Sequence, residues 1–168
     1  SKIKWNPAIK SKNDRDALWQ ALKEDKIDII ASDHAPHTIE EKNNKYLSCP
    51  SGGPMIQHTI LSLLQKCKKY GVSYEKIVEK IAHNPATIFK VNKRGFLREG
   101  YYADIVLIDT NTPTHVTEES LLYKCGWSPF EGQKFDNSIY KTILNGNVVY
   151  EDGKVNSIPY GKKITFNR

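Results

Sequence analysis

The stretch IDIIASDHAPH, residues 27–37, joins an apolar, β-branched run to a cluster of ionisable side chains. Its first five residues are mostly apolar, which is typical of a buried strand. The run then gives way to Asp33, His34 and His37, and Pro36 stiffens the chain between the two histidines. Because catalytic groups gather where the strands of an α/β barrel end, this stretch predicts a strand leading into a functional site. Taken alone, the same residues would also suit a capped turn with solvated histidines.

A second strand-like piece, residues 3–6, precedes this stretch and ends at Pro7, which stops ladder pairing and directs Asn6 into a loop. Between the two runs, residues 14–26 carry apolar side chains at helical spacing, and Asn13 is a candidate N-cap. A strand, a helix and a second strand in this order predict a βαβ crossover, which places both polar clusters on one rim of the sheet.

A long polar loop follows, from residue 38 to residue 54, and loops of that length in compact folds are usually functional or mobile. We favour a functional loop. It ends in SGGP, residues 51–54, where two glycines precede a proline at an expected helix start. This pattern predicts backbone N–H groups at the positive end of a helix dipole, which suit an anionic or carbonyl oxygen. A plain helix-entry turn is the alternative.

The rest of the chain divides into a helical part and a β part. Helices are predicted over residues 54–71 and 73–86, and Ser73 opens the second one. Further along, residues 105–109 form an apolar run bounded by turn residues, which predicts a strand. Residues 140–150 predict a hairpin, because two β-branched runs flank an Asn-Gly pair, a strong turn signal.

Length, charge and cysteine usage exclude several classes of protein. The 168 residues carry a formal net charge of +6, but the lysines are scattered beside acids, so we expect a solvated surface and no nucleic-acid partner. No apolar run approaches the roughly 18 residues of a membrane span, so no membrane partner is expected. Cys49, Cys67 and Cys125 follow no Cys-x-x-Cys pattern and are interpreted as free thiols of a cytoplasmic protein. Cys67 falls on an apolar helix face, and His58 and His83 are interpreted as packing or surface histidines.

Three polar segments stand in a defined order along the chain: KWNPAIK (residues 4–10), SDHAPH (residues 32–37) and PSGGP (residues 50–54). In order and spacing they resemble the last three active-site segments of the dihydroorotase family, part of the amidohydrolase superfamily of metal-dependent cyclic amidases. The resemblance covers most of residues 1–150. The string DHAPH is fairly specific, because related dihydropyrimidinases and allantoinases share its Asp-His pair and usually lack its second histidine. PAIK stands where many bacterial members carry two prolines and an arginine, which we interpret as a subfamily variation.

The resemblance implies an α/β fold with two parts. Residues 1–92 are expected to be the C-terminal part of a TIM-like (β/α)8 metal-dependent hydrolase barrel, and residues 93–168 a segment of a small β-sandwich domain with a C-terminal tail. A complete barrel typically needs about 250 residues. We therefore expect this chain to be the C-terminal portion of a longer protein.

The resemblance also implies roles for individual residues. Asp33 is implied as a metal ligand and as the general base, because one carboxylate oxygen can bind a metal while the other moves a proton. His34 would either orient Asp33 or cap the loop. The implied substrate contacts are Asn6, His37, Ser51 and Gly52.

The implied activity is that of a zinc-dependent dihydroorotase, which reversibly hydrolyses the cyclic amide of (S)-dihydroorotate to N-carbamoyl-L-aspartate in pyrimidine biosynthesis. Two zinc ions per complete active site and a small-molecule substrate are expected with it, and a homodimer is one assembly that fits it. The family's other metal ligands would lie upstream, so we expect these 168 residues alone to hold no catalytic zinc and to be inactive. The alternatives are another cyclic amidohydrolase, such as a dihydropyrimidinase or an allantoinase, and a non-catalytic scaffold protein.

Overall fold

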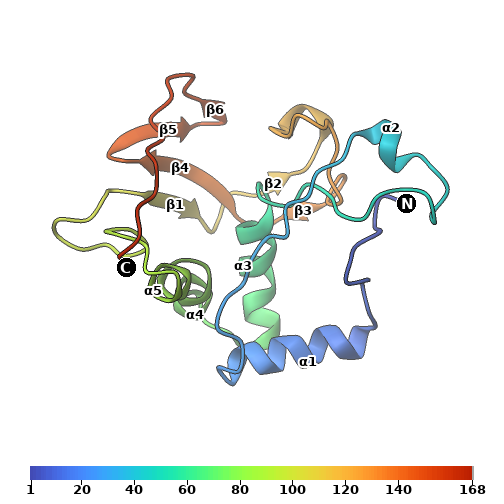
Figure 1. The fold of residues 1–168 in the computed structure, drawn as a ribbon, viewed down its shortest axis with the longest axis horizontal. Coiled ribbons are helices and arrows are strands. Elements are labelled where there is room, and N and C mark those ends of the chain that lie inside the picture. The colour runs from blue at the N-terminus through green and yellow to red at the C-terminus, as the bar shows by residue number, and fades with distance from the viewer. Residues whose placement is uncertain (168) are drawn as a thin grey trace.

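The computed structural model describes residues 1–167, and its helices and strands gather in different parts of the molecule (Figure 1). Helix α1 (Lys12–Lys23) lies across one end of α3 (Thr59–Tyr70), where Trp19 stacks on Tyr70 with ring centroids 4.8 Å apart. The other helical segments are α2 (Ile39–Lys42), α4 (Tyr74–Val78), a π-helical turn (Glu79–His83), α5 (Asn84–Ile88) and a 3-10 turn (Glu118–Ser120).

Helix α1 begins earlier than predicted because Ser11, and not Asn13, is its N-cap. The backbone N–H of Asp14 donates to Ser11 Oγ at 3.3 Å, and the N–H of Ser11 donates to the Asp14 carboxylate at 2.9 Å. These two bonds form a capping box, which satisfies two N–H groups that the first turn leaves open. The helix then stops at Lys23, before Asp25 takes a left-handed φ of 63°. The predicted N-cap and both predicted ends were therefore wrong by a few residues.

The helix predicted from Ser73 is capped by Ser73 as expected, but it changes its winding before it ends. The N–H of Asn84 donates to the carbonyl of Glu79, a bond to the fifth residue back that makes a π-helical turn. The next bond of this kind would need an N–H from Pro85, which has none. The carbonyl of Lys80 is consequently open to another donor, and it accepts from the N–H of Ile30 at 3.1 Å.

The two runs predicted as barrel strands, residues 3–6 and 27–31, join no ladder within residues 1–167, so these strand predictions were wrong. A strand requires a neighbouring chain whose carbonyls and N–H groups repeat along its length. Single bonds hold these segments instead. Ile30 donates to the π-helical turn, and the carbonyl of Lys4 accepts from the N–H of Gly52 at 2.9 Å.

The apolar side chains of the second run still face a core, as their composition predicts. Ile27 and Ile30 are half-buried and pack against a cluster contributed by α1, α3 and α4. Burial of such side chains removes apolar surface from water and stabilises the helical part. The fully buried members are Leu22, Leu64, Cys67, Val72 and Ile77. Cys67 thus has the core role predicted for it.

The strands form an antiparallel sheet in the order β1-β4-β5-β6, with β1 at Ile105–Asp109, β4 at Ser138–Leu144, β5 at Asn147–Glu151 and β6 at Lys154–Val155. Asn145 and Gly146 connect β4 to β5 with φ angles of 51° and 82°. Two successive positive φ angles suit a two-residue hairpin turn whose twist matches that of the strands. The strand predicted at residues 105–109 and the hairpin predicted at residues 140–150 are both confirmed.

A second, two-stranded sheet pairs β2 (Thr114–His115) with β3 (Lys134–Phe135) and lies against α3. Leu61 of α3 packs with Val116 and Phe135 in a second buried cluster, which joins the helical part to this sheet. The domain division predicted between residues 92 and 93 stays a prediction. Within the described range, no helix has both the length and the apolar character to cross a membrane. Cys49, Cys67 and Cys125 are free thiols, as expected.

Candidate active site

Asp33 follows the extended run 27–31 and has a φ of 45°, in the left-handed region. Aspartate is one of the few residues with a side chain that enters this region at modest cost, because its short polar side chain bonds locally. With this conformation the chain passes from the extended run into residues 34–37. The Asp33 residue itself is exposed. Asp33 is therefore accessible to solvent at the end of this run.

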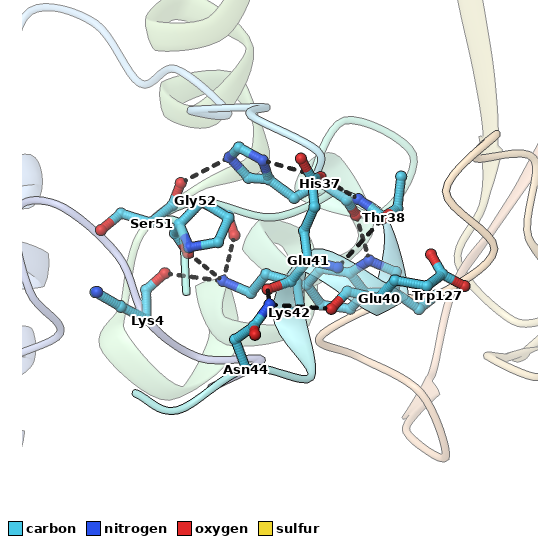
Figure 2. A network of polar contacts seen from close by, with 11 residues as sticks. Lys4, His37, Thr38, Glu40, Glu41, Lys42, Asn44, Ser51, Gly52 and Trp127 are labelled. Atoms are coloured by element: carbon cyan, nitrogen blue, oxygen red, sulfur yellow. Dashed lines mark hydrogen bonds and ion pairs between the residues drawn. The ribbon is translucent and has the colours of Figure 1, made fainter. Parts of the chain in front are cut away.

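His37 is half-buried and has a protein group at each ring nitrogen (Figure 2). Its Nε2 lies 3.0 Å from the carbonyl oxygen of Ser51, and its Nδ1 lies 3.4 Å from the carboxylate of Glu41. Because a carbonyl oxygen only accepts, Nε2 is the donor in the first contact. The indole Nε1 of Trp127 donates to the His37 carbonyl at 2.8 Å and fixes the backbone of the loop. A contact from His37 to a substrate would replace one of the two ring contacts.

Gly52 lies in a turn that approaches the loop containing Asp33 and His37 very closely. Its φ is 107°, and a Cβ there would lie 2.7 Å from the carbonyl oxygen of Ala35. At the neighbouring Gly53, a Cβ would lie 2.7 Å from the Trp5 ring and 2.9 Å from the Trp127 ring. Close packing thus requires glycine at both positions, and at Gly52 the backbone conformation favours glycine as well.

The expectation that these glycines open a helix N-terminus for a ligand was wrong. Helix α3 begins only at Thr59, beyond the Pro54 segment, so its dipole does not act at Gly52. The N–H of Gly52 already donates to Lys4, and its carbonyl accepts from the ammonium of Lys42 at 2.9 Å. The turn is therefore held by other segments of the chain.

His34 ties the Asp33 loop to the segment that precedes α3. Its Nδ1 accepts from the N–H of Met55 at 3.0 Å, and its ring stacks on Tyr123 with centroids 5.6 Å apart. One parallel bridge pairs His34 with Gly53, and the N–H of Ala35 donates to the Gly53 carbonyl at 3.2 Å. Of the two roles considered for His34, the contacts favour the capping role.

The structure brings together the DHAPH loop and the SGGP turn, and the Lys4 bond to Gly52 places the segment before Asn6 beside them. Asn6 is exposed at the end of that segment. A cavity of about 490 Å³ opens between the loop of residues 34–41 and residues 122–125. His34 and His37 line it, whereas Asp33 and Asn6 do not.

Within residues 1–167, no group of three or more His, Cys, Asp or Glu side chains is placed to hold a metal ion. A zinc site in proteins normally has three or four protein ligands. Asp33 alone therefore does not form a metal centre.

Sequence reasoning did not find the contacts by which two residues support the loop. Trp127 lies in a segment far along the chain, is 2% exposed and bonds to His37. Lys42 is fully buried although it lies in the polar string EEKNN, which is typical of a solvated loop. Neither residue carries a local signal, since each is defined by contacts with distant segments. His58 and His83 pack against aromatic rings, which confirms their interpretation as packing residues.

Comparisons with known proteins identify the family and the fold. A model of the amidohydrolase family matches residues 7–149. The dihydroorotase of Clostridium acetobutylicum is 37% identical over 150 residues, which are 89% of this chain and 35% of that protein. That of Pyrococcus horikoshii is 36% identical, covering 96% of this chain and 37% of that protein, and that of Endomicrobium trichonymphae is 41% identical, covering 88% and 35%. The chain therefore spans little more than a third of the length of these relatives.

Solved structures extend the comparison to the fold. A D-hydantoinase superposes with a TM-score of 0.85 at 25% identity, over 92% of this chain and 35% of that one. The dihydropyrimidinase from Brevibacillus agri gives a TM-score of 0.84 at 26% identity over the same shares. The predicted class, a part of an α/β amidohydrolase barrel with an attached β unit, is confirmed. The chain belongs to the amidohydrolase family.

Proposed function

We propose that the polypeptide containing this chain is a dihydroorotase, which reversibly hydrolyses the cyclic amide of (S)-dihydroorotate to N-carbamoyl-L-aspartate in pyrimidine biosynthesis. The observation that carries the proposal is that curated dihydroorotases are 36–41% identical over most of this chain. The juxtaposition of the DHAPH loop and the SGGP turn supports it. Because the chain covers 35–37% of those relatives, the activity belongs to the complete polypeptide.

Asp33 is the residue to which we assign both a metal ligand and the general base. Its exposed carboxylate has two oxygens, so one can bind the metal while the other takes a proton from the attacking water. The same carboxylate then returns that proton to the amide nitrogen that leaves when the ring opens. Hydrolysis without such a group would require an amide anion to depart unprotonated.

The metal in this proposal is zinc, with two ions per complete active site. A bound zinc ion lowers the pKa of its water to about 7 and polarises a carbonyl group. The residues described here fit only a share of such a site, since Asp33 is the one ligand that the resemblance assigns to them. The remaining ligands have to come from other parts of the polypeptide.

Substrate contacts are assigned to Asn6, His37, Ser51 and Gly52. The Asn6 amide both donates and accepts, which suits a ring that presents N–H and C=O groups side by side. His37 is assigned to the substrate carboxylate, because a ring N–H can donate to it. Gly52 contributes through its missing side chain, since its own N–H and carbonyl are already bonded.

The substrate is thus a small molecule, and the free thiols support a reducing, cytoplasmic location. A homodimer stays a prediction. The second candidate activity is that of another cyclic amidohydrolase, such as a dihydropyrimidinase or an allantoinase, and the superposition on a D-hydantoinase and a dihydropyrimidinase is compatible with it. It differs in its substrate, a cyclic amide without the carboxylate of dihydroorotate. The third candidate function is that of a non-catalytic scaffold protein.

The test is hydrolysis of dihydroorotate, dihydrouracil and allantoin by the complete gene product purified with zinc. We expect turnover of dihydroorotate alone. Asp33→Asn should lower kcat by about 10²–10⁴-fold, the usual contribution of a general base, while Asp28→Asn, at an exposed position of the same run, should not. His37→Ala should mainly raise KM for dihydroorotate.

Other outcomes would select the competing activities. Turnover of the neutral rings would favour the dihydropyrimidinase reading and remove the role given to His37. Absence of turnover on all three substrates would favour the scaffold.

A further inference from the structure

Lys42 is the last residue of α2 and has 0% of its surface exposed, which is exceptional for a lysine. Within residues 1–167, no carboxylate lies within ion-pair distance of its ammonium group. Burying a charge in this way is costly unless other polar groups replace the lost water. The polar groups that contact the Lys42 ammonium therefore show which parts of the chain this buried charge stabilises.

The ammonium of Lys42 is surrounded by main-chain carbonyls. It donates to the carbonyls of Pro50 and Gly52, both at 2.9 Å, and lies 3.5 Å from that of Lys4 (Figure 2). An ammonium has three N–H donors, so these three acceptors account for all of them. The rings of Trp5 and Trp127 flank the group, each with its centroid 5.9 Å from Nζ, and attract the positive charge through their faces.

A second lysine holds the other half of the same loop. The ammonium of Lys4 donates to the carbonyls of Tyr46 at 2.8 Å, Leu47 at 3.2 Å and Cys49 at 2.7 Å. The two lysines together fix the loop from residue 46 to residue 52 by its main chain. Lys42 acts on the part that contains Ser51 and Gly52.

The position of Lys42 joins three segments of the candidate site. Its carbonyl partners flank Ser51, whose own carbonyl accepts from His37 at 3.0 Å. Its helix starts at the N-cap Thr38, directly after His37, and Glu41 of that helix faces His37 Nδ1. Its third partner, Lys4, lies two residues before Asn6.

We propose that Lys42 is a positioning residue, which holds the Ser51–Gly52 turn in register with His37 and with the Asn6 segment so that all three meet the substrate together. The effect on substrate binding rests on the proposed function, whereas the effect on the turn does not. Burial also lowers the pKa of Lys42, which agrees with a charge held by dipoles instead of by an anion.

The experiment replaces Lys42 with Met in the complete polypeptide and uses Lys45→Met as the matched control, because Lys45 is an exposed lysine of the same loop. We expect Lys42→Met to raise KM for dihydroorotate by about 10- to 100-fold, since misplacing a binding group by 1 Å has effects of that size. The zinc content should stay the same, and kcat should change by less than about 3-fold. A general loss of structure would instead lower kcat and zinc content together.

Amide hydrogen exchange provides a readout that does not depend on activity. The N–H of Gly52 donates to Lys4 across the same contact, so its exchange should accelerate at least about 10-fold in Lys42→Met and remain unchanged in Lys45→Met. If Lys42→Met does not fold, Lys42→Gln, which keeps two N–H donors, should show smaller changes in the same direction.

The two proposals fail in different ways. A wild-type enzyme that hydrolyses dihydroorotate, combined with unchanged KM and unchanged Gly52 exchange in the Lys42 variants, overturns the positioning role and leaves the proposed function intact. A wild-type enzyme without turnover overturns the proposed function, and faster Gly52 exchange would then still support the positioning of the turn.

Discussion

His58 stands directly before α3, and aromatic rings enclose its imidazole. The rings of Tyr123, Phe130 and Phe135 have centroids 5.8–5.9 Å from it, and only 1% of its surface is exposed. Burial disfavours the charged form, and it lowers the pKa of His58 from 6.5 to about 4. His58 is therefore neutral in the folded protein at pH values where an unfolded chain would already carry a proton.

This difference predicts a loss of stability in mild acid. The contribution of His58 is complete above pH 6.5 and is lost as the pH falls toward 4, because only the unfolded state takes up the proton in that range. The loss should reach about 3 kcal/mol, at 1.36 kcal/mol per pKa unit. Urea unfolding between pH 7 and pH 4 measures it. His58→Phe should flatten this dependence and His115→Gln, at an exposed position, should not; an equal slope in all three proteins would contradict the prediction.

At the scale of elements, the SGGP turn and the DHAPH loop depend on each other through Gly52. A methyl group at Gly52 would meet the Ala35 carbonyl at 2.7 Å, and its φ of 107° is unfavourable for any residue with a Cβ. By contrast, Gly132 has a φ of 78° but no atom within 4 Å of an added Cβ. Alanine substitutions at Gly52 and at Gly132 therefore separate two costs in the free energy of unfolding: the cost of the positive φ, which both share, and the cost of close packing, which only Gly52 has.

We expect Gly52→Ala to lower the free energy of unfolding by about 1–3 kcal/mol more than Gly132→Ala, because overpacking adds to the conformational cost. Thermal or urea unfolding of the two variants measures the difference. Equal losses would show that the loop moves away from the turn without cost.

Elements that depend on neighbouring residues were predictable from the sequence, whereas those that depend on distant partners were not. The Asn-Gly turn between β4 and β5 is specified by two residues and was predicted correctly. Residues 27–31 have the composition of a strand, but pairing requires another segment beside them, and composition carries no information about it. The same holds for Lys42, whose buried position includes contacts with the distant residues Trp5 and Trp127.

In the predicted site, too, features set by neighbouring residues could be predicted, and features set by distant partners could not. Asp33, His37 and the two glycines could be chosen as candidates because their residue types and spacing are unusual in a local window and resemble a known family, and their roles stay predictions. The bonds of Gly52 to Lys4 and Lys42 could not be found in this way, since they join segments separated by up to 48 residues of chain. The prediction of a ligand-binding helix N-terminus was wrong because α3 begins only at Thr59 and because these bonds already occupy the N–H and the carbonyl of Gly52.

At the scale of the whole molecule, Arg94 connects the end of the helical part with the sheet. Its guanidinium pairs with Asp104, donates to Asn145 Oδ1 at 2.8 Å and lies over the Tyr102 ring at 4.2 Å. Asp104 in turn accepts from the N–H of Asn145 at 2.8 Å, so the hairpin turn is part of the same network. The C-terminal segment also returns to α5, where Val91 bridges Phe166 (Figure 1).

Arg94→Met should lower the free energy of unfolding by about 2 kcal/mol, the usual worth of a partly buried hydrogen bond to a charged group. It should also accelerate amide exchange in β1 and β4 more than in α3, because the network anchors the sheet. Arg98→Met, which removes an exposed arginine nearby, is the control. A double-mutant cycle with Asp104→Asn measures the coupling, and a coupling energy near zero would contradict the role given to Arg94.

The lysine contacts also bear on how this loop can change during evolution. Among the described residues, the hydrogen bonds of Lys4 and Lys42 go to main-chain oxygens, most of them in residues 46–52, and every amino acid supplies the same oxygen. Mutations at the exposed loop positions Tyr46, Leu47 and Ser48 should therefore leave the shape of the loop nearly unchanged as long as its length is kept. A lineage can therefore exchange the exposed side chains of this loop, while the two lysines and Gly52 preserve the backbone frame on which those side chains are displayed.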